Sequence, residues 1–290
     1  MTPWEYAQRY LPIQVPGNGK TYPINIGRYH RGNPTPAQQK LLSDVIDHFA
    51  AKQRDKTYRL KLTVNDETIE IADRREISRS LQVPFLGKGS PEDCQIVLQL
   101  ALLVGKVTPE RLQAWADDNL GLDCNGYVGN YLFHDLLQQP WRVAPKEGQV
   151  GPSTTIDGYF ERWGDTPITD LSKIDPNRMH LIVRVDSKGK VIKQYSEGKA
   201  GHVAITQPGE IRKAYATDIG DADPDAAKLG MAGKLALRTV ESGGPINGVG
   251  RNWLVFIKPS SAFAGVFSVN RDKIHFDDTI RIAPLRPKPL

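Results

Sequence analysis

The first part of the chain carries apolar residues at helical spacing. After Pro36 these positions recur at intervals of three and four residues and predict a helix: Leu41, Leu42, Val45, Ile46 and Phe49. Ser90 and Thr108 are each followed by Pro and acidic residues, which is a start signal of helices. We therefore predict two further helices, over residues 90–104 and 108–119.

β-favouring segments occupy other parts of the chain. Residues 58–64 and 68–71 flank Asn65-Asp66-Glu67, a turn-forming break that predicts a β-hairpin. From Leu181 onward, strand-like segments are mostly separated by Gly- and Pro-rich turns: 181–185, 191–195, 202–206, 211–216, 237–241, 253–257, 265–269 and 279–282. Helices followed by a mostly antiparallel sheet make an α+β order, which is the fold class we expect.

The composition is that of a globular protein. Of 290 residues, 39% are apolar and 24% charged, which excludes a disordered, collagen-like or coiled-coil chain. The net charge of +5 is compatible with an anionic partner without selecting one. The basic clusters lack the aromatic spacing of a nucleic-acid platform, so no nucleic-acid partner is expected. Residues 1–34, rich in Pro, Gly and aromatic side chains, predict an irregular arm over the body.

Cysteine and histidine usage narrows the chemistry. Two cysteines, Cys94 and Cys124, exclude a disulfide framework, and neither they nor the six histidines have metal-ligand spacing, so we expect no metal or cofactor. The N-terminus lacks a basic segment followed by an apolar core, and the longest apolar run, residues 96–104, is too short for a bilayer. We expect no signal peptide, no membrane span and a protein that is cytoplasmic as synthesised.

The most informative segment surrounds Cys124. A helix should begin there, with Asp123 near the capping position, because the following apolar residues fall at helical spacing: Tyr127, Val128, Tyr131 and Leu132. A helix N-terminus favours the thiolate over the thiol and makes the sulfur a competent nucleophile. The alternative is a small buried cysteine in a core helix.

A histidine at a strand start offers the base that a thiol nucleophile needs. In residues 201–206 the alternation places Val203 and Ile205 on one side of a sheet, with His202 on the other side. From the start of its strand, the imidazole could approach a helix terminus packed against the sheet and exchange a proton with the thiol. The alternative is a structural histidine.

Together these segments resemble the NlpC-type cell-wall peptidases, a branch of the papain-like cysteine peptidases. That family carries Asp-Cys-Ser-Gly-Phe/Tyr-Val at a helix start, which residues 123–128 match with Asn125 in place of the usual Ser. It then carries a strand beginning His-Val-Gly/Ala-Ile, matched by residues 202–205, after a strand matched by residues 175–183. The resemblance covers about residues 110–270.

The resemblance implies a catalytic triad in which Cys124 is the nucleophile, His202 is the base and a third polar residue orients the imidazole. Short members of the family place the third residue soon after the histidine strand, where residues 214–216 are Ala-Tyr-Ala in this chain. The best match is Glu241, which ends a strand before a Gly-rich turn.

Other positions stay open. Asp218 and Asn252 are rivals of Glu241 for the third position. The backbone N–H of Cys124 is one expected oxyanion donor, and Asn119 is a candidate for the second.

The implied fold is a papain-like α+β hydrolase, with the cysteine helix packed on a mostly antiparallel sheet. We expect residues 1–90 to form an N-terminal extension of a helix and a β-hairpin. Residues 91–290 would form the catalytic domain, with an insertion at about 218–236.

The implied activity is cysteine-dependent amide hydrolysis, by a thiol peptidase or amidase acting on the peptide stems of peptidoglycan. Because no signal peptide is expected, one hypothesis is a secreted antibacterial effector or toxin, exported by a signal-independent system and paired with an immunity protein. One alternative is a papain-like acyltransferase or deamidase acting on a protein or lipid substrate. Another is a binding module in which Cys124 is structural.

Overall fold

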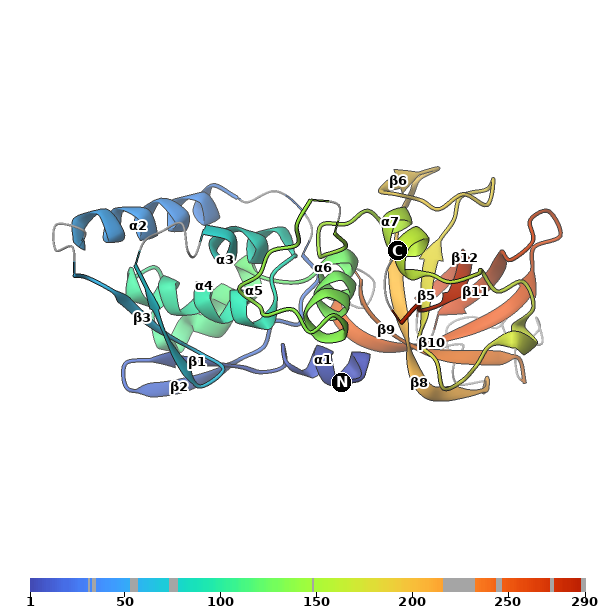
Figure 1. Cartoon of the computed structure of the whole chain (residues 1–290), viewed down its shortest axis with the longest axis horizontal. Coiled ribbons are helices and arrows are strands. Elements are labelled where there is room, and N and C mark those ends of the chain that lie inside the picture. Colours follow the sequence, from blue (N-terminus) through green and yellow to red (C-terminus); the bar gives the residue numbers. More distant parts are fainter. Residues whose placement is uncertain are drawn as a thin grey trace.

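The computed structural model of the chain has an α+β fold, which confirms the expected class (Figure 1). Figure 1 shows most helices at one end, an antiparallel barrel at the other, and helices α1 (Pro3–Gln8) and α6 (Cys124–Asn130) between them. The structure describes residues 1–30, 32, 35–52, 57–72, 78–147, 149–215, 233–243, 247–271 and 274–287.

The helices predicted for the first part of the chain are present as α2 (Pro36–Lys52), α4 (Pro91–Leu103) and α5 (Leu112–Asn119). The first turn of the third predicted helix is instead a 3-10 helix, Pro109–Arg111. Shorter helical segments are α3 (Ser78–Gln82), α7 (Ile156–Trp163), the 3-10 turns Val83–Leu86 and Leu171–Lys173, and the π-helical continuation of α6, Tyr131–Leu136.

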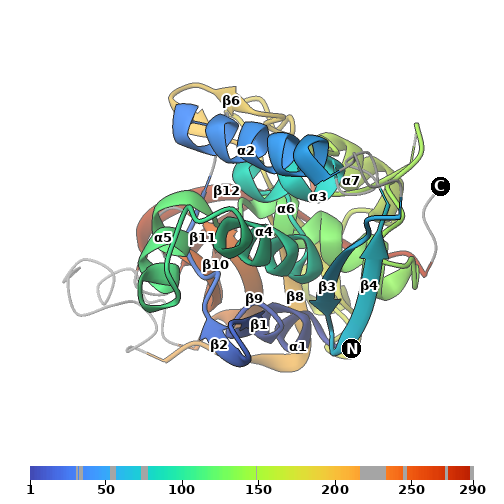
Figure 2. The ribbon, with the colours of Figure 1, turned by 90° about the vertical axis from the view of Figure 1, so that its left-hand side faces the viewer.

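Helix α4 is the centre of the helical end. Its start is a capping box: the Ser90 hydroxyl accepts from the Asp93 N–H (3.1 Å), and the Asp93 carboxylate accepts from the Ser90 N–H (3.0 Å). Residues 91–101 of the helix are all buried. Figure 2 shows α4 in the middle of this end, with α2 above it and hairpins beside and below it.

The predicted hairpin is formed by β3 (Leu60–Val64) and β4 (Glu67–Ile71). Its two turn residues, Asn65 and Asp66, have φ of 50° and 65°, as the tight turns between twisted antiparallel strands require. Leu60, Leu62 and Val64 alternate toward the core, so the hairpin covers one side of α4.

The prediction of an irregular arm over residues 1–34 is wrong. The chain begins with α1, where the Thr2 hydroxyl accepts from the Glu5 N–H (3.3 Å) and Glu5 accepts from the Thr2 N–H (2.7 Å). A second hairpin follows, β1 (Ile13–Gly17) and β2 (Lys20–Ile24). The aromatic residues that suggested an arm are core residues, since Tyr6 and Tyr10 are fully buried.

The strands of the second half close into a barrel with the order β10-β11-β12-β5-β8-β9, in which every neighbouring pair is antiparallel. They are β5 (His180–Arg184), β8 (Val203–Lys213), β9 (Leu235–Gly243), β10 (Gly248–Pro259), β11 (Phe267–Arg271) and β12 (Ile274–Pro284).

Two strand predictions need correction. Residues 202–206 and 211–216 belong largely to one bent strand, β8, whose register shifts between Thr206 and Ile211 around Gly209 (φ 80°). The predicted strand at 191–195 is wrong: Val191 makes an isolated bridge to Val185, and the short pair β6 (Tyr195–Ser196) and β7 (Lys199–Ala200) follows.

One hydrophobic cluster connects the two ends of the molecule. Tyr6 of α1 and Val45 of α2 belong to the same cluster as Tyr127 of α6 and Leu181 of β5. The domain boundary near residue 90 stays a prediction. Of the expected insertion, residues 218–232 lie outside the described residues, and Leu235 and Ala236 begin β9.

Candidate active site

Cys124 is the first residue of α6, which confirms the expected helix start. Asp123 caps the helix, and its Oδ1 accepts from the Gly126 N–H (2.6 Å). Close packing fixes this turn, because a Cβ on Gly126 would lie 1.8 Å from the Gly87 carbonyl oxygen. Only a glycine at 126 therefore allows the cysteine helix to start here without a shift of the backbone.

The barrel presents His202 to this helix terminus. His202 immediately precedes β8, and the next residues show how the strand lies: Val203 and Ile205 belong to the cluster that contains α6 residues, whereas Ala204 faces the barrel interior. Strand alternation would place His202 on the Ala204 side, yet His202 acts on the Cys124 thiol, whose pKa its imidazole lowers; the thiol also lies 3.5 Å from Asn125 Oδ1. The residue lies outside β8 proper, so the strand's alternation does not dictate its direction.

The environment of Cys124 favours its thiolate. Burial raises the pKa of the thiol, but the hydrogen bond and charge of His202 lower it, and the resulting pKa lies below the usual thiol value. Cys94 is the opposite case, because burial, Asp93 and Glu92 together raise its pKa well above the usual value. The surroundings of the two cysteines therefore shift their thiol pKa values in opposite directions.

Glu241 is the hydrogen-bond partner of His202. It lies in β9 between β8 and β10, and its Oε2 accepts a hydrogen bond from His202 Nε2. Its Oε1 accepts from Asn252 Nδ2 (3.0 Å) and from the Thr239 hydroxyl (3.3 Å). Since Glu241 engages Nε2, the other ring nitrogen, Nδ1, is the one left to exchange a proton with the thiol.

The structure separates the other candidates for the third position. Asn252 contacts the Glu241 carboxylate, so it supports Glu241 and is one residue removed from the imidazole. Asp218 lies outside the described residues.

Asn119 is not brought to the thiol. It is the last residue of α5, and its side chain donates to the Trp115 carbonyl in its own helix (2.9 Å). The backbone N–H of Cys124 is in the first turn of α6, where N–H groups have no partner within the helix. It therefore has no acceptor within α6.

A cavity of about 180 Å³ lies beside Cys124. Two lysines, Lys88 and Lys193, line it together with Tyr29, Asp123, Asn125, Ile156, Gln194 and Gly201. The Lys88 ammonium is largely buried and binds both carboxylate oxygens of Asp123, at 2.7 and 2.5 Å. Lys193 reaches the Asp157 carboxylate (2.6 Å).

The sequence analysis did not identify the two lysines of this cavity. Lys88 is 36 positions before Cys124, in the turn between the Val83–Leu86 helix and α4, and lies outside the part of the chain that the resemblance covers. The one local signal is Gly87-Lys88-Gly89, a turn that lets the backbone approach closely: Gly87 has φ 72° and its carbonyl accepts from the Asp123 N–H (3.0 Å).

Within the described part of the chain, no group of three or more His, Cys, Asp or Glu side chains is arranged to hold a metal ion. In the same residues no helix is both long and apolar enough to cross a bilayer.

Comparisons of the chain with models of protein families, with curated sequences and with solved structures found no match.

Proposed function

We propose that the protein is a cysteine-dependent amide hydrolase with a papain-like catalytic arrangement. The observation that carries the proposal is the continuous contact from the Cys124 thiol through the His202 imidazole to the buried Glu241 carboxylate. A cysteine at a helix start, a base and a group that orients the base are the parts that nucleophilic acyl transfer requires. The lowered pKa of Cys124 supports this role over a purely structural one.

The reaction proceeds by acyl transfer to sulfur. The Cys124 thiolate attacks the amide carbonyl carbon, and the carbonyl oxygen becomes an oxyanion that the Cys124 N–H stabilises. The His202 imidazolium donates its proton to the leaving nitrogen as the C–N bond breaks, which leaves a thioester. His202 then takes a proton from water, the hydroxide attacks the thioester carbon, and the sulfur leaves as thiolate with the acid as product.

In this proposal Lys88, and not Asn119, is the second group that stabilises the oxyanion. Its ammonium lines the cavity beside the thiol and carries positive charge where the oxyanion develops. Asp123 neutralises part of that charge and fixes the lysine, so Lys88 acts from a set position.

The resemblance to NlpC-type peptidases supports the peptide stems of peptidoglycan as substrate. Purified peptidoglycan incubated with the protein should yield fragments whose masses sum to the parent plus one water. Cys124→Ala should yield none, and Cys94→Ala, the matched control, should cleave like the parent. Intact peptidoglycan, or the same fragments from Cys124→Ala, would contradict the proposal, and a fragment enlarged by an acceptor amine would indicate an acyltransferase.

The effector hypothesis rests on the proposed wall substrate. The protein directed to a bacterial periplasm should slow growth, whereas Cys124→Ala should not. An immunity protein would restore growth by covering the cavity at Cys124. Unimpaired growth with the folded parent protein in the periplasm counts against this hypothesis.

A further inference from the structure

Residues 200–202 lead from the β6–β7 hairpin into β8, and a hydrogen bond holds the backbone of each. The Ala200 carbonyl accepts from Arg184 Nη1 (2.6 Å). The Gly201 N–H donates to the Gln194 carbonyl (2.7 Å), and the His202 carbonyl accepts from the Arg184 N–H (3.1 Å). Arg184 therefore supplies two of these three bonds.

Arg184 is the last residue of β5 and lies opposite His202. The ladder between β5 and β8 ends at the pair Val183 and Val203, and the bond from the Arg184 N–H extends it by one residue. The guanidinium then reaches Ala200, two residues before His202. Arg184 thus supports the chain at the point where the strand pairing no longer does.

The Arg184 guanidinium has a fixed position of its own. Its Nη2 donates to Asp278 Oδ2 (2.7 Å), and both side chains are largely buried. Asp278 lies on β12, the other neighbour of β5 in the barrel. Because a guanidinium is a rigid planar fork, the bond to Asp278 at one nitrogen fixes the direction in which the other nitrogen meets the Ala200 carbonyl.

The space around Gly201 is tight. A Cβ on this residue would lie 2.3 Å from the Ile192 carbonyl oxygen and 2.7 Å from Ile156 Cδ1. Gly201 and Ile156 both line the cavity beside Cys124. A displacement of residues 200–202 would therefore change the wall of this cavity as well as the direction of the His202 imidazole.

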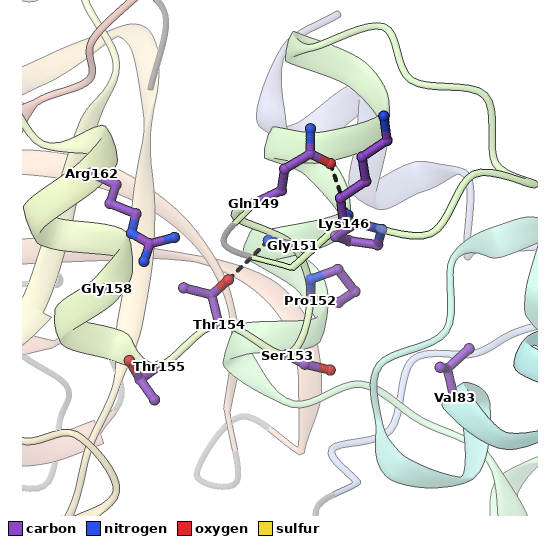
Figure 3. Close-up of a pocket in the computed structure, with 11 residues that line it drawn as sticks. Val83, Lys146, Gln149, Gly151, Pro152, Ser153, Thr154, Thr155, Gly158 and Arg162 are labelled. Carbon is purple, nitrogen blue, oxygen red and sulfur yellow. Dashed lines mark hydrogen bonds between the residues drawn. The ribbon is translucent and has the colours of Figure 1, made fainter. Parts of the chain in front are cut away.

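A different set of contacts holds the start of α6. Asn125 donates from Nδ2 to the Thr154 carbonyl (2.9 Å), and the Thr154 hydroxyl accepts from the Gly151 N–H (2.9 Å). Figure 3 shows the second of these bonds, in the loop before α7. Arg184 takes no part in these contacts, so we expect its loss to move His202 relative to a thiol that stays in place.

We propose that Arg184 is a positioning residue, which holds residues 200–202 so that the His202 imidazole stays where it acts on the Cys124 thiol. It acts through the Ala200 carbonyl and the His202 backbone, with Asp278 as its anchor. This inference rests on the proposed hydrolase function and adds the residue that fixes the base. A misplacement of about 1 Å in a catalytic group can cost on the order of a hundredfold in rate.

The pH profile of Cys124 alkylation by iodoacetamide, in the Cys94→Ala background, tests this role without a substrate. The charged groups that the structure places around the sulfur stay unchanged: His202, Asp123, Lys88 and Lys193. Arg184→Met, which removes both side-chain bonds, should move the profile up by about 1 pH unit, because a displaced imidazole no longer lowers the thiol pKa. On a soluble stem peptide of peptidoglycan, kcat should fall about ten- to a hundredfold while KM stays within about threefold.

Two further variants separate position from charge and from general damage. Arg184→Lys keeps the positive charge but loses the planar fork, so it should show at least half of the shift of Arg184→Met. Arg178→Met is the matched control. Arg178 lies two residues before β5 and also donates to a backbone carbonyl, that of Leu285 (3.1 Å), so its loss should change neither the profile nor kcat.

A folded Arg184→Met whose profile and kcat match those of Arg178→Met would overturn the positioning role. A parent-like profile in Arg184→Lys would also overturn it, since charge alone would then explain the shift. If Arg184→Met does not fold, Arg184→Lys and Asp278→Asn take its place, and both should shift the profile upward. A shifted profile in a protein whose parent does not cleave peptidoglycan would count against the hydrolase function and not against the positioning of His202.

Discussion

The Nε2 atom of His202 donates a hydrogen bond to the Oε2 atom of Glu241, and both side chains are buried. The pair joins residues 39 positions apart on adjacent elements of the barrel, and Asn252 and Thr239 hold the second carboxylate oxygen. The imidazole therefore has a fixed orientation, with its other nitrogen left to exchange a proton with the Cys124 thiol.

Glu241→Gln should lower kcat/KM by about ten- to a hundredfold, because the amide keeps a hydrogen-bond partner for the ring but removes the charge that stabilises the imidazolium. Asn252→Ala, which removes a donor to Glu241, should have a milder effect. Kinetics of both variants on the same substrate check this. A Glu241→Gln variant that matches the parent would show that the carboxylate does not assist His202.

His202→Ala should lose about as much activity as Cys124→Ala, since the two residues act as one unit. The double variant should be no worse than either single variant. Single-turnover rates of the three proteins provide the measurement. If His202→Ala stays within about tenfold of the parent, roughly 1.4 kcal/mol, another group serves as the base.

Lys88→Met should raise the pKa of Cys124. Asp123 already acts to raise that pKa, and without the Lys88 ammonium its carboxylate would be uncompensated beside the sulfur. The pH profile of thiol alkylation should therefore move to higher pH, and kcat should fall about ten- to a hundredfold. Lys193→Met, in the same cavity but paired with Asp157, is the matched control and should leave the profile in place. An unmoved profile in Lys88→Met contradicts the assigned role.

His180 should make the protein less stable at mildly acidic pH. Burial and the nearby Arg178 lower the pKa of this histidine to about 4 from an ordinary value of 6.5. Between these values the unfolded chain binds a proton that the folded protein excludes, so the free energy of unfolding falls as the pH falls from 6.5 toward 4. The difference in pKa corresponds to at most about 3 kcal/mol. The free energy of unfolding, measured with urea at several pH values, should depend less on pH in His180→Asn than in the parent. The same pH dependence in both proteins would exclude His180 as the cause.

Local signals explain which parts of the fold could be predicted. Ser90 and Asp123 specify helix starts through side-chain hydrogen bonds to nearby N–H groups, and Asn65-Asp66 specifies a turn, so these features depend on a few consecutive residues. Closure of the barrel depends on pairing between β12 and β5, which lie far apart in the sequence and which no local pattern identifies as partners. The prediction for residues 1–34 was wrong because Pro and aromatic residues are typical of an irregular arm. The capping box of Thr2 and Glu5, a local signal for a helix, was overlooked.

The candidate site was predictable to a similar extent. Cys124 and His202 lie in two short motifs, residues 123–128 and 202–205, and Glu241 lies in a predicted strand; the structure places His202 where it acts on the thiol and hydrogen-bonds to Glu241. Asn119 lies five residues before Cys124 in the sequence, but its side-chain amide donates to the Trp115 carbonyl within α5. Lys88 belongs to a turn that is distant in the sequence, and the packing of Gly87 against the start of α6 places it near Cys124. Sequence spacing could not predict this position, because it depends on tertiary contacts.

The rate of Cys124 alkylation by iodoacetamide as a function of pH tests the central claim most directly. In the Cys94→Ala background, we predict that alkylation of Cys124 stays fast at lower pH than alkylation of an ordinary thiol, because its pKa is lowered. His202→Ala should return the profile toward that of an ordinary thiol. Slow alkylation of Cys124 below pH 7, at a rate no greater than that of Cys94 in Cys124→Ala, would contradict the account.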